Sequence, residues 1–325
     1  ALGSAGQTVP GAAAETVNVA EKDPYNVASI VLADGPAGLR LRSEYQVRAD
    51  GSVDGGDFLD GFENGYFAEP KEPTGTVYHQ YCTAIPVGTL LAQSWNLDLM
   101  KKLGQMIAGE MNEFEVTLWL APGMSLHRNP LCGRNFEYYS EDPLLAGRMA
   151  SAMTLGVQSV PGCGTTIKHY ACNNQEDNRM GSDSILSERT LREIYLKGFE
   201  IAIRNAQPMA MMTSYNLING VHAANSYDIC TKAARDEWGF EGAIMTDWTT
   251  TTDSTAGECT AAGCMKAGND MVMPGDIRDH ASIRQALEDG SLDIRELKRC
   301  VYHTVKIILQ SNQYEDAVSY EDQFK

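Results

Sequence analysis

Short apolar runs that end in polar residues alternate with amphipathic segments along most of this chain. Seven runs have the length and composition of β-strands: "ASIVLADGP", "CTAIPVG", "VTLWLAPG", "TTIKHYAC", "MAMMTSYN", "GAIMTDW" and "DMVMPG". Helical patterns occur mostly between them, over residues 98–115, 143–160, 187–205, 280–289 and 293–310. This alternation predicts a parallel sheet, and the nearly continuous apolar strands predict that both of its faces are covered.

Two α/β architectures contain such a sheet, an open doubly wound sheet and a barrel. The open sheet usually carries a glycine-rich phosphate turn, and neither G-x-G-x-x-G nor G-x-x-x-x-G-K-[ST] occurs in this sequence. The length of 325 residues is usual for a barrel. We therefore predict one (β/α) TIM-type barrel domain over residues 1–325. It is expected with or without its first strand, because only 33 residues precede Asp34.

The segment 44–81 is rich in glycine, acidic residues and aromatic residues. It is too polar for a core and too long for an ordinary connection. We predict an elaborated βα loop over the mouth of the barrel. One interpretation is that its aromatic side chains Phe58, Phe62, Tyr66 and Phe67 stack on part of a substrate. The alternative is a disordered acidic segment without such a role.

Charge and cysteine usage exclude several classes of partner. The chain has 43 acidic and 26 basic residues, a net charge of -17, which disfavours nucleic acids and anionic membranes. No apolar run reaches the ~20 residues of a membrane span. The eight cysteines form no C-x-x-C pair and no N-x-[ST] sequon occurs, so we expect a reducing, cytoplasmic compartment. No H-E-x-x-H or similar spacing predicts a metal or cofactor site.

The carboxyl ends of the strands in a barrel meet on one face, where barrel enzymes perform their chemistry. The predicted strands bring five residues to that face, Asp34, Lys168, His169, Tyr215 and Asp247, and Arg134 follows "LWLAPG" in a loop. An acid flanked by cations and hydrogen-bond donors is typical of a nucleophilic carboxylate that is kept ionised. We therefore expect these neighbours to lower the pKa of Asp247.

Simpler interpretations of the same residues remain open. Asp247 precedes "WTTTT" and is suited to cap a helix, and Asp34 precedes Gly-Pro and is suited to a turn. Arg134 is close enough in sequence to Glu137 or Glu141 to form a surface ion pair. Lys168 and His169 are adjacent, so on a regular strand they would face opposite sides; both reach one site only if the strand has a bulge there.

Six motifs, in the order of the chain, resemble the barrel domain of the family 3 glycoside hydrolases, especially β-glucosidases. They are "LADGPAGLR", "GRNFEYYSEDP", "IKHYACNNQEDNR", "MMTSYNLING", "GAIMTDW" and "AGNDMVMPG". The resemblance implies that Asp247 is the nucleophile and that Tyr215 lies beside it. It also implies that the sugar is bound by Asp34, Arg134, Lys168 and His169, with Trp248 of the "TDW" motif in the same substrate-binding set.

The resemblance also implies a mechanism. Terminal β-D-glucosides or short oligosaccharides would be cleaved with retention through a glycosyl ester, without a cofactor or metal. If the aromatic side chains of segment 44–81 contact a substrate, they would stack on an aglycone beyond the cleaved bond. The family's general acid usually belongs to a second, α/β-sandwich domain, expected here outside this chain, as in a domain-permuted relative whose sandwich precedes the barrel. The alternative function is a sugar-binding barrel without catalysis, or an incomplete fragment without turnover.

Overall fold

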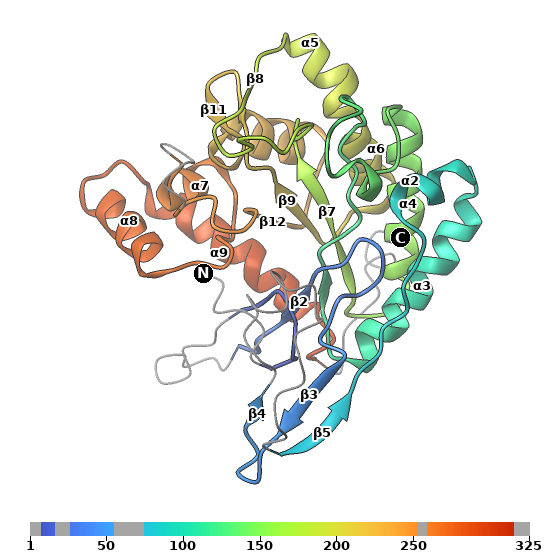
Figure 1. The fold of residues 1–325 in the computed structure, drawn as a ribbon. Helices are drawn as coiled ribbons and strands as arrows, with labels where there is room; N and C mark the ends of the chain where they lie inside the picture. The colour runs from blue at the N-terminus through green and yellow to red at the C-terminus, as the bar shows by residue number, and fades with distance from the viewer. Residues whose placement is uncertain (1–7, 17–26, 55–74, 253–258, 315–325) are drawn as a thin grey trace.

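A curled, six-stranded sheet forms the centre of the computed structural model, which describes residues 8–16, 27–54, 75–252 and 259–314 (Figure 1). Five strands are parallel: β2 (Val31–Ala33), β6 (Leu118–Trp119), β7 (Gly164–Tyr170), β9 (Ala210–Thr213) and β12 (Ala243–Met245). The short strand β1 (Ala14–Glu15) precedes them and pairs antiparallel with β2 at the edge. The predicted (β/α) barrel is therefore confirmed in a truncated form.

Helices follow most of the parallel strands. One set packs side by side along the sheet: α3 (Leu97–Glu113), α4 (Pro143–Val157) and α6 (Lys197–Ala206). A second set lies beyond β12: α7 (Ala261–Ala267), α8 (Ile277–Glu288) and α9 (Ile294–Leu309). Shorter helical segments are α2 (Gly88–Gln93), η1 (Asn135–Glu137), α5 (Glu188–Thr190), η2 (Leu191–Tyr195), η3 (Ala223–Asn225) and η4 (Asp228–Glu237). None of the helices described is long and apolar enough to cross a membrane.

Local sequence explains where several helices begin. Asp142 caps α4 by accepting a hydrogen bond from the Leu144 backbone N–H at 2.8 Å, and Pro143 takes the first helical position. The helices α8 and α9 each begin with a capping box, which pairs Asp276 with Asp279 and Asp293 with Glu296. These caps satisfy backbone N–H groups that have no partner within the helix.

Both faces of the sheet are buried, as the apolar strands predict. Alternate side chains such as Val31, Ile167 and Met211 pack toward the helices, whereas Leu32, Met212 and Met245 fill the interior of the curled sheet. Ile307 and Ile308 near the end of α9 belong to the interior cluster. The last helix therefore helps to fill the space that a full ring of strands would enclose.

Two predicted strands and one predicted helix differ in the structure. The segment "CTAIPVG" is not a strand but leads directly into α2, because Pro86 lacks the N–H that a ladder requires. The run "DMVMPG" forms only one bridge, between Met271 and Met245. The helix predicted over 187–205 is present but changes from α5 through the π-helical segment η2 to α6.

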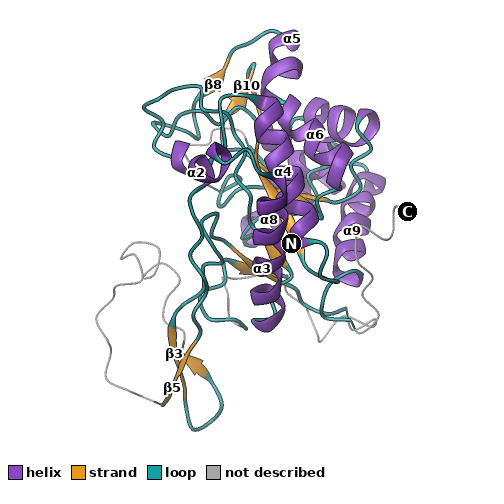
Figure 2. Ribbon diagram, turned by 90° about the vertical axis from the view of Figure 1, so that its right-hand side faces the viewer, coloured by secondary structure: helices purple, strands orange, loops and turns teal. Residues whose placement is uncertain are grey.

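The segment predicted as a long βα loop contains a small antiparallel sheet. Its strands are β3 (Glu44–Val47), β4 (Val53–Asp54) and β5 (Thr76–His79), with β3 in the middle. We call β3, β5 and the strand β4 between them in the chain the hairpin. In Figure 2 it projects away from the helices at the lower left, where β3 and β5 are labelled. Residues 55–74, and with them the predicted aromatic contacts of Phe58, Phe62, Tyr66 and Phe67, lie outside the described residues. A third small sheet joins β8 (Asp183–Ser184), β10 (Leu217–Ile218) and β11 (Val221–His222).

Candidate active site

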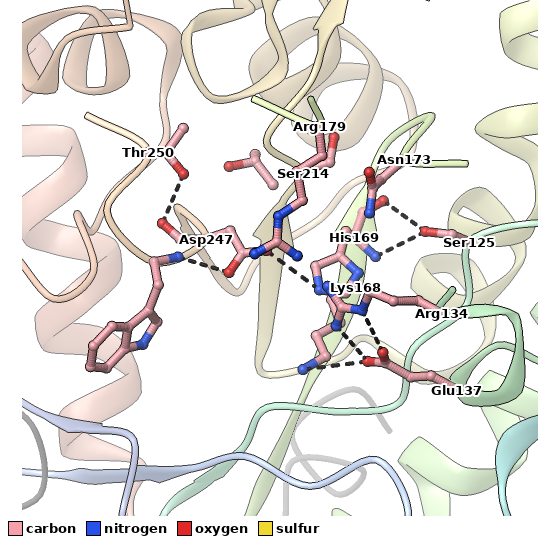
Figure 3. Close-up of polar contacts among 12 residues, drawn as sticks. Ser125, Arg134, Glu137, Lys168, His169, Asn173, Arg179, Ser214, Asp247 and Thr250 are labelled. Carbon is pink, nitrogen blue, oxygen red and sulfur yellow. Dashed lines mark hydrogen bonds and ion pairs between the residues drawn. The ribbon is translucent and has the colours of Figure 1, made fainter. Parts of the chain in front are cut away.

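The carboxyl ends of the parallel strands bring the predicted site residues together. Asp34 follows β2, Lys168 and His169 lie near the end of β7, and Asp247 lies two residues beyond β12. All seven predicted residues line one cavity of about 910 Å³: Asp34, Arg134, Lys168, His169, Tyr215, Asp247 and Trp248. Figure 3 shows Arg134 and the adjacent residues Lys168 and His169 near Asp247; Arg134 comes from a loop, and the other two come from β7.

Asp247 is held at one carboxylate oxygen. Its Oδ1 accepts a hydrogen bond of 2.7 Å from the Trp248 backbone N–H. Its Oδ2 is buried, lies 3.5 Å from His169 Nε2, and makes no hydrogen bond within the described part of the chain. The residues after Asp247, up to residue 252, form turns and not a helix, so the helix-cap interpretation is wrong.

The pKa of Asp247 lies above its ordinary value. Burial raises the pKa, and the positive charges of Arg134 and Lys168 and the Trp248 N–H lower it by less. The expectation that the neighbours would give a net lowering was therefore wrong, because desolvation exceeds their attraction. Burial also raises the pKa of the Tyr215 hydroxyl, and the nearby Asp247 carboxylate raises it further, so Tyr215 stays neutral.

Asp34 has the opposite shift. Burial raises its pKa, but Lys168 and Arg40 together hold it well below the usual range. The Lys168 Nζ donates to Asp34 Oδ1 at 2.7 Å, and Arg40 pairs with the other oxygen. The turn that carries Asp34 needs glycine at position 35, where φ is 117° and an added Cβ would collide with the Gly38 carbonyl oxygen. Asp34 is thus a fixed carboxylate at the cavity wall.

Arg134 forms an ion pair, but at the cavity and not at the outer surface. Its Nε and one terminal nitrogen donate to the two oxygens of Glu137 at 2.7 and 2.9 Å. Glu137 is only 5% exposed and lies 3.7 Å from Lys168 Nζ. This bidentate pair fixes the orientation of a guanidinium that faces the cavity.

Lys168 and His169 both line the cavity although they are adjacent. The register between β7 and β9 shifts between Ile167 and Tyr170, which is the irregularity that the two residues required. Ser125 fixes the His169 backbone, since its hydroxyl accepts from the N–H and donates to the carbonyl. Burial lowers the pKa of His169 well below its usual value, and the nearby cations, Arg134 first, lower it further. The imidazole is therefore neutral.

The sequence profile described as "Glycosyl hydrolase family 3 N terminal domain" matches residues 70–307. This chain belongs to glycosyl hydrolase family 3. It is 51% identical over 166 residues to β-glucosidase A of Butyrivibrio fibrisolvens, a match that covers 51% of this chain and 20% of that protein. It is also 42% identical over 226 residues to an exo-α-(1→6)-L-arabinopyranosidase of Bifidobacterium breve, over 70% of this chain and 29% of that enzyme.

A solved family 3 structure has the same fold. β-Glucosidase 3B of Thermotoga neapolitana, in complex with glucose, superposes with a TM-score of 0.79 at 39% identity, over 97% of this chain and 40% of that one. The chain therefore spans between a fifth and two fifths of the length of these relatives. The activity and substrates of the whole protein are accordingly a matter of proposal.

Four further charged residues of this family 3 chain line the cavity and were not predicted as site residues: Arg40, Glu137, Glu176 and Arg179. Arg40 pairs with Asp34, and the Arg179 guanidinium lies 4.4 Å over the Tyr215 ring while donating to Glu176 at 2.8 Å. Arg40 and Arg179 do stand inside two of the six motifs, but their distance from the strand ends gave no indication that they return to the cavity. In the described residues, no three His, Cys, Asp or Glu side chains are grouped to hold a metal ion.

Proposed function

We propose that this chain is the nucleophile-bearing part of a retaining β-glucosidase, with Asp247 as the nucleophile. The observation that carries the proposal is the Asp247 carboxylate, which borders the cavity with one oxygen held by a backbone N–H and the other without a hydrogen bond in the described chain. Burial of this carboxylate removes the water that would otherwise weaken it as a nucleophile.

The reaction we propose has two displacements. An Asp247 oxygen attacks the anomeric carbon as the glycosidic C–O bond breaks, and the leaving oxygen receives a proton from a general acid. Water then attacks the anomeric carbon, gives its proton to the same group, and releases the sugar and the Asp247 carboxylate. Two inversions give net retention of configuration.

The residues around Asp247 are suited to bind an uncharged sugar. Asp34 offers carboxylate oxygens to sugar hydroxyls, and Lys168 and Arg134 offer N–H groups whose positions their ion pairs fix. Neutral His169, whose Nε2 lies 3.5 Å from Asp247 Oδ2, is placed to contact the sugar from the cavity wall. Tyr215 and Trp248 border the same cavity. A sugar whose hydroxyls leave these buried groups unpaired would bind less well, which provides selectivity between epimers.

We infer that the substrates are terminal β-D-glucosides or short oligosaccharides, and not nucleic acids or anionic membranes. The names of several relatives, β-glucosidases, support this class, and the arabinopyranosidase relative makes α-L-arabinopyranosides the second class to assay. The net charge of -17 supports the exclusion of polyanions. A cytoplasmic location is our further proposal, supported by the cysteine pattern and the lack of an N-x-[ST] sequon.

The general acid, in our proposal, belongs to a second domain outside these 325 residues, and residues 1–325 are one barrel domain. Three carboxylates besides Asp247 face the cavity from the described residues, and each is ion-paired with an arginine: Asp34 with Arg40, Glu137 with Arg134 and Glu176 with Arg179. None is free to face a leaving group. The greater length of the relatives supports a further domain.

Covalent labelling tests the nucleophile. Incubation with 2,4-dinitrophenyl 2-deoxy-2-fluoro-β-D-glucoside should add one fluoroglucosyl group to the peptide that contains Asp247, as read by mass spectrometry. Asp247→Asn should lower turnover of dinitrophenyl β-glucoside on the order of 10³-fold or more, because an amide is a poor nucleophile. Asp177→Asn is the matched control, since Asp177 is exposed and does not line the cavity. Label on a different peptide would exclude Asp247 as the nucleophile.

The competing function is a barrel that binds sugars without turnover. Both hypotheses predict glucose binding, so affinity does not separate them. Product formation followed by NMR does, and the first-formed anomer also tests retention. Binding without label or product in the chain and in a longer protein that contains it would establish the non-catalytic alternative.

A further inference from the structure

Tyr138 lies behind the cavity, next to the predicted site but not in it. It follows η1 directly and is completely buried, and it is not among the residues that line the cavity. Its hydroxyl lies 3.0 Å from His169 Nδ1, and the two rings meet edge to face at 74°. Its backbone carbonyl accepts a hydrogen bond of 3.0 Å from Thr89. The ring therefore has little freedom to move away from His169.

The two nitrogens of His169 face two different groups. Nδ1 meets the Tyr138 hydroxyl, while Nε2 lies 3.5 Å from Asp247 Oδ2. Oδ2 is the oxygen that makes no hydrogen bond within the described chain. The His169 ring thus lies between the Tyr138 hydroxyl and the Asp247 carboxylate. Gain or loss of a proton at Nδ1 therefore changes whether Nε2 carries the proton that faces Asp247.

Only one of these nitrogens carries a proton. His169 is only 1% exposed, and Arg134, Lys168 and Arg179 oppose a second proton on its ring. A proton on Nε2 faces the negative carboxylate and is favoured. A proton on Nδ1 would instead turn the Nε2 lone pair toward that carboxylate, which is repulsive. With the proton on Nε2, Nδ1 is an acceptor and the Tyr138 hydroxyl is the group that donates to it.

We propose that Tyr138 is a positioning residue, which fixes His169 as its Nε2–H tautomer so that the ring presents a donor to Asp247. The role in catalysis rests on the proposed function of Asp247 as nucleophile; the tautomer itself does not. A donor opposite Oδ2 stabilises the ionised carboxylate before attack and its return as a leaving group when the ester is hydrolysed. Asp247 favours this tautomer from the Nε2 side, and Tyr138→Phe removes the hydroxyl that stabilises it from the Nδ1 side.

Several other groups face Asp247, and Tyr138→Phe does not alter them. They are Arg134 from the loop after β6, Lys168 on β7, Arg179 from the loop after β7, Tyr215 after β9 and the Trp248 backbone N–H. Glu137 faces Lys168 and Arg134. None of them contacts Nδ1 in the described residues, so Tyr138→Phe leaves their contacts with Asp247 in place.

Nitrogen-15 NMR of the histidine rings tests the tautomer directly. His169→Gln identifies the His169 signals by their loss. The wild-type chain should show His169 neutral with its proton on Nε2, and Tyr138→Phe should move part of the population to Nδ1–H, because only Asp247 then favours Nε2–H. A wild-type proton on Nδ1, or the same tautomer in both proteins, would overturn the proposal. The wild-type spectrum decides this even if the variant fails to fold.

Kinetics test whether the tautomer acts on Asp247. With dinitrophenyl β-glucoside, Tyr138→Phe should lower kcat/KM about tenfold and move the acidic limb of its pH profile up by about one unit, because a donor to the carboxylate is lost. Tyr139→Phe is the matched control, since Tyr139 is also buried and its hydroxyl has no hydrogen bond in the described chain. In a His169→Gln background, Tyr138→Phe should cost nothing further.

The two measurements separate the possible failures. A tautomer that changes without any movement of the pH profile would overturn the positioning role. A full additional loss in the His169→Gln background would also overturn it, since Tyr138 would then act by another route. Covalent label on a residue other than Asp247 would refute the proposed function while leaving the tautomer result valid.

Discussion

Asp34 and Asp247 border one cavity, yet their surroundings shift their pKa values in opposite directions. Asp34 is lowered by Lys168 and Arg40 despite burial, so its ionised form stabilises the fold at pH values above its ordinary pKa of about 4. That contribution is lost as the pH falls toward the lower value of the folded state. The pKa of Asp247 is raised, so the fold loses stability as the pH rises through it.

Two isosteric variants should therefore change stability with opposite signs at pH 7. Asp34→Asn leaves buried Lys168 without its close ion pair, with Glu137 at 3.7 Å as the nearest carboxylate among the described residues, and should lower the free energy of unfolding by about 3 kcal/mol. Asp247→Asn removes a desolvated charge and should raise the melting temperature while abolishing turnover. Thermal melts at pH 7 and at pH 4 check both signs, since the Asp247→Asn gain should shrink at the lower pH. A stabilised Asp34→Asn would contradict the ion-pair argument.

The sequence predicted these residues well where a strand end places them. Asp34, Lys168, His169 and Asp247 all reach the cavity because parallel strands point their carboxyl ends the same way. It did not predict Arg179, whose side chain returns to the cavity through a loop path that no periodicity encodes. The pKa of Asp247 was predicted with the wrong sign, because charge can be counted in a sequence but burial cannot.

At the scale of elements, the hairpin of β3 and β5 is the part of the described fold least tied to the core. Its strand β5 is exposed along its whole length, and Tyr45 stacks on Tyr78 within the hairpin itself. The two chain segments meet at its base, where the Gln80 N–H donates to the Ser43 carbonyl at 3.0 Å. This base also borders the cavity.

Removing the hairpin should therefore spare the body of the protein. Replacement of residues 44–79 by a two-residue Asn-Gly turn joins Ser43 to Gln80 and should leave the melting temperature nearly unchanged. The Asp247 peptide should still be labelled by the fluoroglucoside. If the aromatic residues of this segment contact an aglycone, KM for an aryl glucoside should rise while the inhibition constant of glucose stays constant. Equal changes for both ligands would exclude that contact.

Elements were predicted from sequence to the extent that local pattern determines them. The buried strands β2, β6, β7, β9 and β12 were found because each is a continuous apolar run bounded by polar residues. The segment η4 was missed, although Ile229, Cys230, Ala233 and Ala234 are buried on one side of it, since charged residues interrupt its few apolar ones and its winding is π-helical. The hairpin was missed because its strands β3 and β5 have only four residues each, none of them buried, and depend on pairing with each other.

At the scale of the whole molecule, the chain has a large negative net charge, whereas most charged groups in the cavity are paired with groups of opposite charge. The chain carries a net charge of -17, but the cavity pairs its arginines and Lys168 with carboxylates: Arg40 and Lys168 with Asp34, Arg134 with Glu137 and Arg179 with Glu176. Asp247 remains without such a close partner, apart from His169. The negative charge of Asp247 would repel an anionic sugar, and the described cavity has no unpaired cation that would offset this repulsion. This charge pattern supports the proposal that the substrates are neutral glycosides.

The 325 residues alone should react only with substrates that need no general acid. Because the cavity carboxylates other than Asp247 are ion-paired, the isolated chain should form its glycosyl ester only from substrates whose leaving group needs no proton. Dinitrophenyl β-glucoside meets that condition, whereas cellobiose and alkyl glucosides should react about 10² to 10⁴-fold more slowly relative to a protein with its acid, and the deficit should grow with leaving-group basicity. A plot of log kcat/KM against leaving-group pKa measures this directly.

A longer protein, or the proposed second domain supplied separately, should restore the rates for basic leaving groups and leave the dinitrophenyl substrate nearly unchanged. That selective recovery is the physical signature of proton donation, since improved sugar binding would raise the rates for all leaving groups alike. If the 325 residues alone cleave cellobiose with a bell-shaped pH profile, the acid lies within them. Glu176 would then be the first candidate, because its pair with Arg179 is more open to solvent than the pair between Glu137 and Arg134.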